Sequence, residues 1–124
     1  MDFQSKKSIY LQIADYACEQ ILLKKWPEKE KILSIRDLAI SLGVNPNTVT
    51  RTYAFLEEKN IIEMQRGIGY FVAKNAYKNV IELKKAEFLT KDLPQLFKTM
   101  DLLHINLKSV QQLYKERIKH ENEQ

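Results

Sequence analysis

The sequence predicts a mainly α-helical protein with one small β-hairpin. Apolar residues recur at helical spacing through most of the chain. The periodicity changes after Asn60, where two short β-prone runs flank a turn that contains Gly67 and Gly69. Gly43 separates two short helical stretches, which is the pattern of a helix–turn–helix. Together these features predict a winged helix–turn–helix domain followed by a helical tail.

The composition is that of a small globular protein. Its 124 residues, 44% of them hydrophobic, suit one compact domain, or a small domain with an appendage. No apolar run is long enough to span a membrane, and the first five residues lack the apolar core of a signal peptide. We expect the single cysteine, Cys18, to be a packing residue, and we expect the protein to be cytoplasmic.

We expect the first helix to run from about Ile9 to Lys25. Ile13, Ala17 and Ile21 recur at i, i+4 and i+8 and would form one apolar stripe. Pro27 then prevents a simple continuation of the helix. This helix is expected to pack against the two that follow.

The second and third helices have clear start and stop signals. Ser34 is a favoured N-cap residue, and Asp37 follows at the spacing of a capping box. Gly43 lies where a left-handed residue would end the second helix. Asn45 can cap the third helix, and Pro46 is tolerated in its first turn because the missing N–H has no partner there. These two helices form the expected helix–turn–helix.

A two-stranded hairpin is expected after the third helix. Ile61–Ile62 starts one strand, residues 65–69 form the turn, and Tyr70–Val72 return as the second strand. Such a hairpin is marginally stable alone, so we expect it to pack against the helices as a wing. The winged helix–turn–helix domain is therefore expected over residues 1–76.

Residues 77–124 are expected to form a helical tail. Pro94 implies either a kink or a break near Asp92. Asn106 is expected to cap a last helix that ends at about Ile118. No metal-binding cluster or catalytic motif accompanies these helices.

The tail contains more apolar side chains than two short helices can bury unaided. Part of this surface can pack on the first helix, and the rest needs a partner, most simply a second copy related by a two-fold axis. The alternative is a monomer whose tail folds back over its own winged helix. The residues expected at the dimer interface are Leu89, Leu96, Phe97, Met100, Leu103, Leu113 and Tyr114.

The third helix has the composition of a DNA-recognition helix. From Leu38 to Leu56 the only charged residue is Arg51, so no carboxylate would repel phosphate. Asparagine can pair with adenine, the threonine methyl can contact the thymine methyl, and arginine can bind guanine or phosphate. One alternative is an ordinary solvated face. Another is a protein-binding surface, which would favour large apolar side chains. Small-molecule sensing would need a pocket that the tail is too short to build.

Two further arginines are candidate DNA contacts. Arg36, at the start of the second helix, could bind phosphate or form a surface ion pair with Asp37 or Glu28. We favour a contact between Arg36 and a DNA phosphate. Arg66 lies at the expected hairpin tip, where it could enter a narrow minor groove or be the exposed residue of a plain turn.

The sequence lacks the parts of an enzyme. His104 and His120 both lie in the tail, and no metal cluster, nucleophile elbow or phosphate-binding glycine loop is present. Glu57 and Glu58 occupy adjacent helix positions, which do not share a face. We therefore expect no catalytic residue, no metal and no cofactor.

Several linked motifs resemble the GntR family of transcription regulators. They extend over residues 9–73 and comprise Ile9-Tyr10-Leu11-Gln12-Ile13, Ser34-Ile35-Arg36-Asp37-Leu38-Ala39, Leu42-Gly43-Val44-Asn45-Pro46-Asn47-Thr48-Val49, Leu56-Glu57 and Arg66-Gly67-Ile68-Gly69-Tyr70-Phe71-Val72. One departure is Leu33, where the family commonly has proline. The short tail is similar to that of the YtrA-type subgroup, whose members are often associated with transporter operons.

The resemblance implies a homodimer that binds a palindromic double-stranded DNA operator, most simply as a repressor. The short tail suggests no small-molecule ligand. The family's DNA contacts would fall by position on Arg36, Asn45, Asn47, Thr48, Thr50, Arg51, Arg66 and Gly67.

Overall fold

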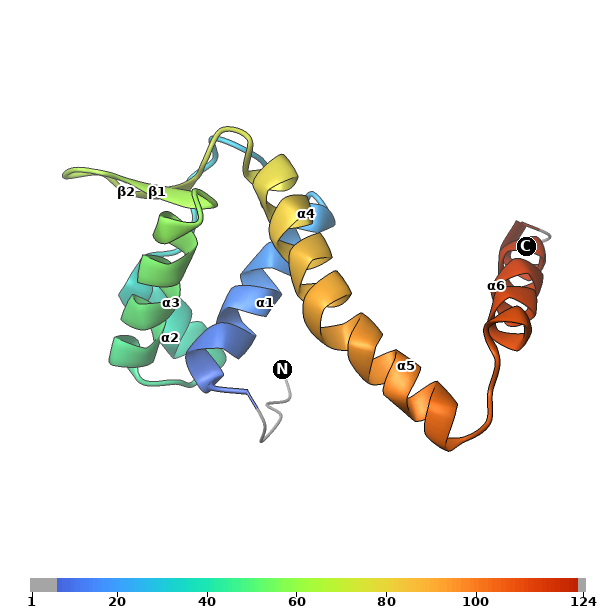
Figure 1. The fold of residues 1–124 in the computed structure, drawn as a ribbon. Coiled ribbons are helices and arrows are strands. Elements are labelled where there is room, and N and C mark those ends of the chain that lie inside the picture. The colour runs from blue at the N-terminus through green and yellow to red at the C-terminus, as the bar shows by residue number, and fades with distance from the viewer. Residues whose placement is uncertain (1–6, 123–124) are drawn as a thin grey trace. The chain divides into compact units, whose positions relative to one another are not determined.

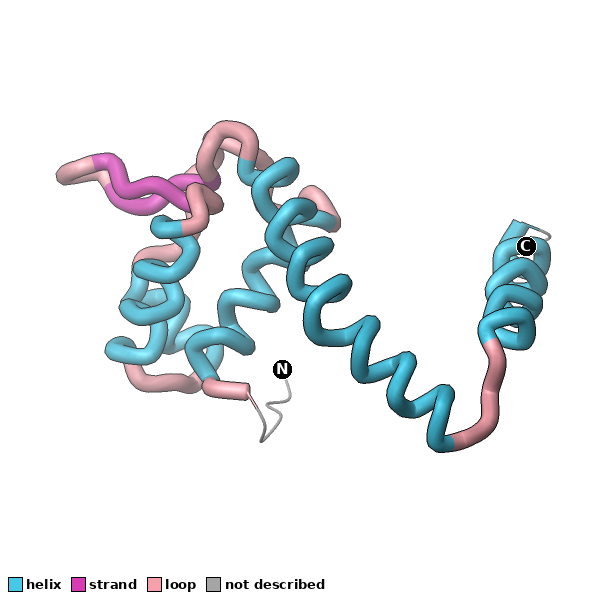
Figure 2. Tube along the Cα trace, in the orientation of Figure 1, coloured by secondary structure: helices cyan, strands magenta, loops and turns pink. Residues whose placement is uncertain are grey.

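The computed structural model describes residues 7–122 and divides the chain into two compact units, Met1–Lys84 and Lys85–Gln124. We call these the N-terminal unit and the C-terminal unit. The described elements, in chain order, are α1 (Ile9–Leu22), α2 (Ile35–Leu42), α3 (Pro46–Glu58), β1 (Ile62–Gln65), β2 (Gly69–Val72), α4 (Ala76–Glu87), the π-helical turn η1 (Phe88–Asp92), α5 (Leu93–Leu102) and α6 (Leu107–Asn122) (Figure 1). The predicted mainly helical fold with a small β wing is confirmed (Figure 2).

Helix α1 ends at Leu22, earlier than the expected Lys25. Lys24 adopts a left-handed conformation, with φ of 61°. The Lys24 N–H donates to the Ile21 carbonyl, and the Lys25 N–H donates to the Gln20 carbonyl. This is the hydrogen-bond pattern of a Schellman motif, which terminates a helix even where the left-handed residue is not glycine.

The expected caps of α2 and α3 are confirmed. The Ser34 hydroxyl accepts the Asp37 N–H at 3.1 Å, and Gly43 ends α2 with φ of +66°. The Asn45 side-chain oxygen accepts the Asn47 N–H at 2.8 Å, and Pro46 is the first residue of α3. These local bonds satisfy backbone groups that a helix end otherwise leaves without partners.

The core of the N-terminal unit lies between its helices and the base of the wing. Its fully buried large side chains include Ile13, Ile21, Val49, Tyr53, Leu56, Ile61, Val72 and Val80. Val80 and the buried Ala76 lie one turn apart on α4, and Lys84, a further turn along, forms an ion pair with Asp15 of α1. The contacts therefore divide the chain after Lys84, which is later than the boundary expected after residue 76.

The wing is an antiparallel pair in which Ile62 faces Val72 and Gln65 faces Gly69. The segment before α2, from Glu30 to Ile32, pairs with the outer edge of β2. The Ile32 N–H donates to the Tyr70 carbonyl, and the Val72 N–H donates to the Glu30 carbonyl, both at 2.9 Å. These backbone hydrogen bonds stabilise the hairpin, which would be only marginally stable as two strands alone.

In the C-terminal unit, the helix widens at η1 before Pro94 rather than breaking. Proline removes one backbone donor and its ring crowds the carbonyl four residues earlier, and a π-helical turn accommodates both effects. His104 then ends α5 with φ of 56°, in the turn expected there. Asn106 caps α6 through the Ser109 N–H at 2.8 Å, and α6 continues beyond Ile118 to Asn122.

Candidate nucleic-acid interface

Helix α3 has one buried face and one exposed polar face. Asn47, Thr50 and Arg51 are exposed, together with Ala54, whereas Thr48 is half-buried. The spacing of 47, 50, 51 and 54 places these four positions on one side of the helix. The opposite side packs into the core through Val49, Thr52, Tyr53 and Leu56. The polar face is therefore presented by a helix whose opposite side is packed into the core.

Three elements hold α3 in place. The Tyr53 hydroxyl donates to the Leu33 carbonyl at 2.6 Å, and the Tyr53 ring lies edge-on to Tyr70 of the wing, with centroids 4.8 Å apart. Burial, and secondarily the neighbouring Tyr70, raises the pKa of Tyr53 well above its ordinary value, so the hydroxyl remains a donor. The Thr52 hydroxyl donates to the Tyr10 carbonyl of α1 at 2.7 Å.

Two expected contact residues already use part of their hydrogen-bonding capacity within α3. The Asn45 side-chain oxygen caps the helix, so the amide NH₂ is its group available to an acceptor. The Thr50 hydroxyl donates to the Pro46 carbonyl at 3.1 Å. Its single proton is therefore occupied, and Thr50 could meet DNA through its methyl group. No acidic residue lies in the first turn of α3.

Arg51 lies over an aromatic ring. Its guanidinium carbon is 4.1 Å from the centroid of the Tyr10 ring, at the start of α1. Among residues 7–122, no carboxylate forms an ion pair with Arg51. The polar face of α3 therefore carries a positive charge without an acidic neighbour to neutralise it.

Arg36 and Arg66 are both exposed in the N-terminal unit. Glu28, one of the expected alternative partners of Arg36, instead accepts the Asn75 N–H at 2.6 Å. Arg66 and Gly67 form the tip of the wing, and Gly67 has φ of +79° with open space around it. Figure 1 shows the wing projecting from the end of α3. The arrangement can present cations from α2, α3 and the wing.

Comparisons with known proteins find no matching family model. The chain is 43% identical to the HTH-type transcriptional regulator YhcF of Bacillus subtilis (strain 168) over 95 residues, which cover 77% of this chain and 76% of YhcF. It is 32% identical to the HTH-type transcriptional repressor YtrA of the same organism over 116 residues, covering 94% and 88% of the two chains.

A solved GntR-family regulator from Bacteroides thetaiotaomicron has the same fold, with a TM-score of 0.78 and 38% sequence identity. The match covers 92% of this chain and 99% of that one. The chain belongs to the GntR family. It is a DNA-binding transcription regulator of the YtrA type and not an enzyme, as its sequence motifs predict.

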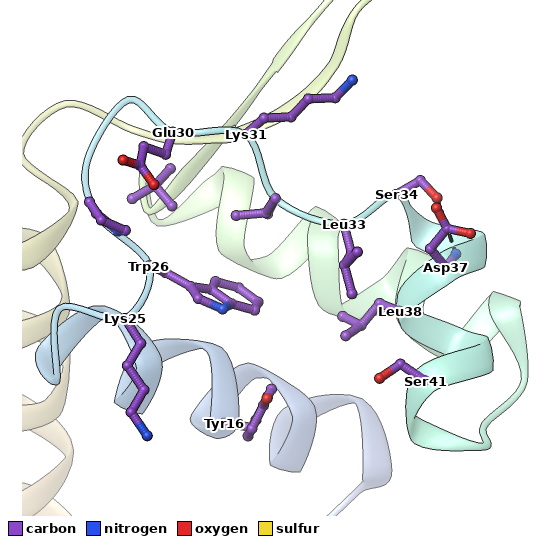
Figure 3. Close-up of a pocket in the computed structure, with 13 residues that line it drawn as sticks. Tyr16, Lys25, Trp26, Glu30, Lys31, Leu33, Ser34, Asp37, Leu38 and Ser41 are labelled. Carbon is purple, nitrogen blue, oxygen red and sulfur yellow. Dashed lines mark hydrogen bonds between the residues drawn. The ribbon is translucent and has the colours of Figure 1, made fainter.

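This GntR regulator also has a cavity of about 510 Å³ in its N-terminal unit. The cavity lies between α1, the strip from Lys25 to Leu33 and the start of α2. Figure 3 shows the Trp26 indole inside it, while the Lys25 side chain extends away. Trp26 lies edge-on to Tyr16, with ring centroids 6.2 Å apart. No sequence motif signals this cavity, because its lining residues come from separate segments of the N-terminal unit.

The local sequence pattern does not identify two residues that support the polar face of α3. Thr52 is polar, yet it is fully buried and its hydroxyl donates to the Tyr10 carbonyl of α1. The Tyr10 ring lies under Arg51. The helical period could have placed Thr52 on the buried face, three residues after the buried Val49 and four before the buried Leu56.

Within the described part of the chain, no group of three or more His, Cys, Asp or Glu side chains could hold a metal ion. No helix there is long and apolar enough to cross a membrane.

Proposed function

We propose that this regulator represses transcription by binding a palindromic operator as a homodimer. The observation that carries the proposal is the exposed face of α3 from Asn47 to Ala54, which is mostly polar and free of carboxylates, while the opposite side of the helix packs into the core. A helix enters the major groove only if its outward side chains are short enough for close approach and do not repel phosphate. The face of α3 meets both requirements.

In this proposal Asn47 reads a base edge, and Arg51 binds guanine or phosphate. Arg36 binds phosphate at the start of α2, and Arg66 enters the minor groove from the wing. The half-buried Thr48 contributes at the edge of the α3 face. The remaining proposed contacts are Asn45, Thr50 and Gly67.

The exposed part of α3 does not favour the rival function of binding another protein. Beyond its polar residues it presents Ala54, while Phe55 is half-buried and Tyr53 is fully buried. Protein-binding hot spots are enriched in exposed Trp, Tyr and Arg side chains around an apolar centre. The α3 face has the arginine but no exposed aromatic ring of its own.

The apolar surface of the C-terminal unit supports the dimer. Leu89, Leu103 and Leu113 are each about 60% exposed, at 58%, 62% and 65%. Water-exposed apolar surface on this scale is usually covered by a partner. Met100 is already buried in the single chain. The other proposed interface residues are Leu96, Phe97 and Tyr114, all of them exposed.

A two-fold dimer would place two recognition helices about one DNA turn apart, roughly 34 Å, or a multiple of that distance. Such spacing demands an operator with inverted half-sites. Repression is supported by the name of the relative YtrA, which is a transcriptional repressor. An operator on genomic DNA also requires the protein to be cytoplasmic.

A gel-shift experiment with DNA from upstream of the protein's own gene tests the proposal. We expect a saturable complex that persists with unlabelled competitor of scrambled sequence and is lost with specific competitor. Inverting one half-site within the bound fragment should weaken binding strongly, because one recognition helix then meets the wrong sequence. Equal binding to the intact and inverted fragments would refute the palindromic operator.

A further inference from the structure

Arg51 is fixed from one side by an aromatic ring before any DNA is present. Its guanidinium carbon lies 4.1 Å from the Tyr10 ring centroid, well within the ~6 Å over which a cation is attracted to an aromatic face. Arg51 is exposed and Tyr10 is half-buried. The ring therefore lies beneath the guanidinium, on the protein side of this contact.

The position of the ring relative to α3 is set by a second contact. The Tyr10 carbonyl accepts the Thr52 hydroxyl at 2.7 Å, and Thr52 directly follows Arg51 in the chain. Thr52 is fully buried, and its hydroxyl is also 3.1 Å from the Thr48 carbonyl. The backbone of Tyr10 is thus tied to the same helical turn that carries Arg51.

This geometry matters because an unsupported arginine is a flexible ligand for DNA. A long side chain loses conformational entropy when DNA fixes it, and preorganisation reduces that loss. A guanidinium that lies over an aromatic ring still has N–H groups along its edge for guanine or phosphate. The ring can therefore order Arg51 without occupying the donors that DNA needs.

We propose that Tyr10 is a positioning residue of the DNA interface, whose ring orients the Arg51 guanidinium for its contact with DNA. The proposal rests on the proposed contact between Arg51 and DNA. It extends the interface to the start of α1, an element that otherwise serves the core. The tyrosine hydroxyl plays no part in it, so an unsubstituted ring should suffice.

A double-mutant cycle on the full-length protein tests the proposal. The variants are Tyr10→Leu, Arg51→Ala and the combination of both, with Tyr10→Phe as the matched control. Affinity is measured by fluorescence anisotropy with the upstream DNA fragment and a scrambled fragment. We expect Tyr10→Leu to weaken specific binding by about two- to fivefold, the range that an exposed cation–π contact supports. Tyr10→Phe should stay within a factor of two.

The informative result is the effect of Tyr10→Leu in the Arg51→Ala background. We expect no further loss there, because the ring then has no guanidinium to orient. The same fractional loss in both backgrounds would show that Tyr10 acts through packing or touches DNA directly, and would overturn the proposal. A loss in Tyr10→Phe as large as that in Tyr10→Leu would overturn it too, because the hydroxyl would then be the active group.

Two controls separate this inference from the proposed function. If Arg51→Ala binds DNA as the wild type does, the Arg51 contact itself is wrong and the role of Tyr10 falls with it. If Arg51→Ala weakens binding but Tyr10→Leu does not, the contact stands and the positioning role alone is refuted. Thermal melting identifies variants that fold poorly. Tyr10→Met, which also lacks a ring, replaces Tyr10→Leu if the latter melts early.

Discussion

At the scale of single residues, the proposed interface separates groups that attract DNA from groups that read it. Arg66 extends from a bare hairpin tip, with Gly67 beside it in open space. Asn47 lies in the first turn of α3, with its backbone N–H already held by Asn45. Replacing Arg66 and replacing Asn47 should therefore change DNA binding in different ways.

We expect Arg66→Ala to weaken DNA binding while leaving the melting temperature unchanged, since Arg66 contributes nothing to the core. If Arg66 contacts phosphate, the slope of log affinity against log salt should become less steep by about 0.9. If it reads the shape of a narrow minor groove, replacing A·T pairs beneath the wing should weaken the wild type more than the variant. Anisotropy titrations at several salt concentrations provide the measurement, with Glu63→Ala on β1 as the control. Wild-type affinity in Arg66→Ala would exclude the wing from the interface.

Asn47→Ala should lower sequence discrimination. A side chain that pairs with a base edge contributes ~1–3 kcal/mol of discrimination against the wrong base. We expect affinity for the operator to fall by that amount while affinity for scrambled DNA stays nearly constant. Competition titrations with both DNAs measure the ratio. Equal losses on both DNAs would mean that Asn47 contacts the DNA backbone.

At the scale of elements, Tyr53 joins α3 to the segment before α2 and to the wing. Its hydroxyl is bonded to the Leu33 carbonyl, and its ring contacts Tyr70. Burial raises the pKa of Tyr53 above its ordinary value of 10.0, and burial followed by the charge of Glu57 raises that of Tyr70. Both shifts favour the neutral phenol in the folded state. The unfolded state therefore holds fewer protons than the folded state once the pH exceeds about 10.

This linkage predicts the direction of a pH effect. The contribution of Tyr53 to the free energy of unfolding should be fully present below pH 10 and should decrease as the pH rises above it. Tyr53→Phe should cost ~1 kcal/mol at neutral pH, the usual net value of a hydrogen bond, and should flatten the alkaline decrease. Urea unfolding between pH 8 and 11 measures both effects. An alkaline decrease of unchanged size in Tyr53→Phe would assign it to other groups.

At the scale of the whole molecule, the two units have different tasks in the proposed function. The N-terminal unit carries the DNA-facing residues, and the C-terminal unit carries exposed apolar side chains that suit a partner copy. Replacing Leu103 and Leu113 by glutamate should convert a dimer into a monomer and abolish operator binding. Gln111→Glu, also exposed on α6, is the matched control and should remain dimeric. Sedimentation at micromolar concentration decides this, and a wild-type monomer would refute the proposed dimer.

The position of a truncation should decide whether the N-terminal unit folds. A chain that ends after Lys84 should remain folded but monomeric, because it retains the buried Ala76 and Val80. A chain that ends after Asn75 should be destabilised, since removing both leaves a cavity in the core. Trp26 is the only tryptophan and lies in this unit, so its fluorescence reports unfolding of both chains. Equal stability of the two chains would show that α4 contributes nothing to the core.

The sequence by itself determined the features that depend on close neighbours in the chain. The caps at Ser34 and Asn45, the end of α2 at Gly43 and the hairpin around Gly67 follow from residues a few positions apart. Periodicity identified the helices, and a proline signalled the disturbance before α5. It could not decide between a kink and a break, because proline removes the same backbone donor in both cases, and the structure has a π-helical turn there.

The tertiary structure alone decided which distant residues meet. The bond from Thr52 to Tyr10 joins residues 42 apart, and that from Tyr53 to Leu33 joins residues 20 apart. Local pattern carries no information about such pairings, because they depend on how the helices pack around a shared core. The same packing places the Tyr10 ring beneath Arg51 and draws the first turns of α4 into the N-terminal unit. The local signals thus specified each element, and burial of the common apolar surface specified how the polar face of α3 is held.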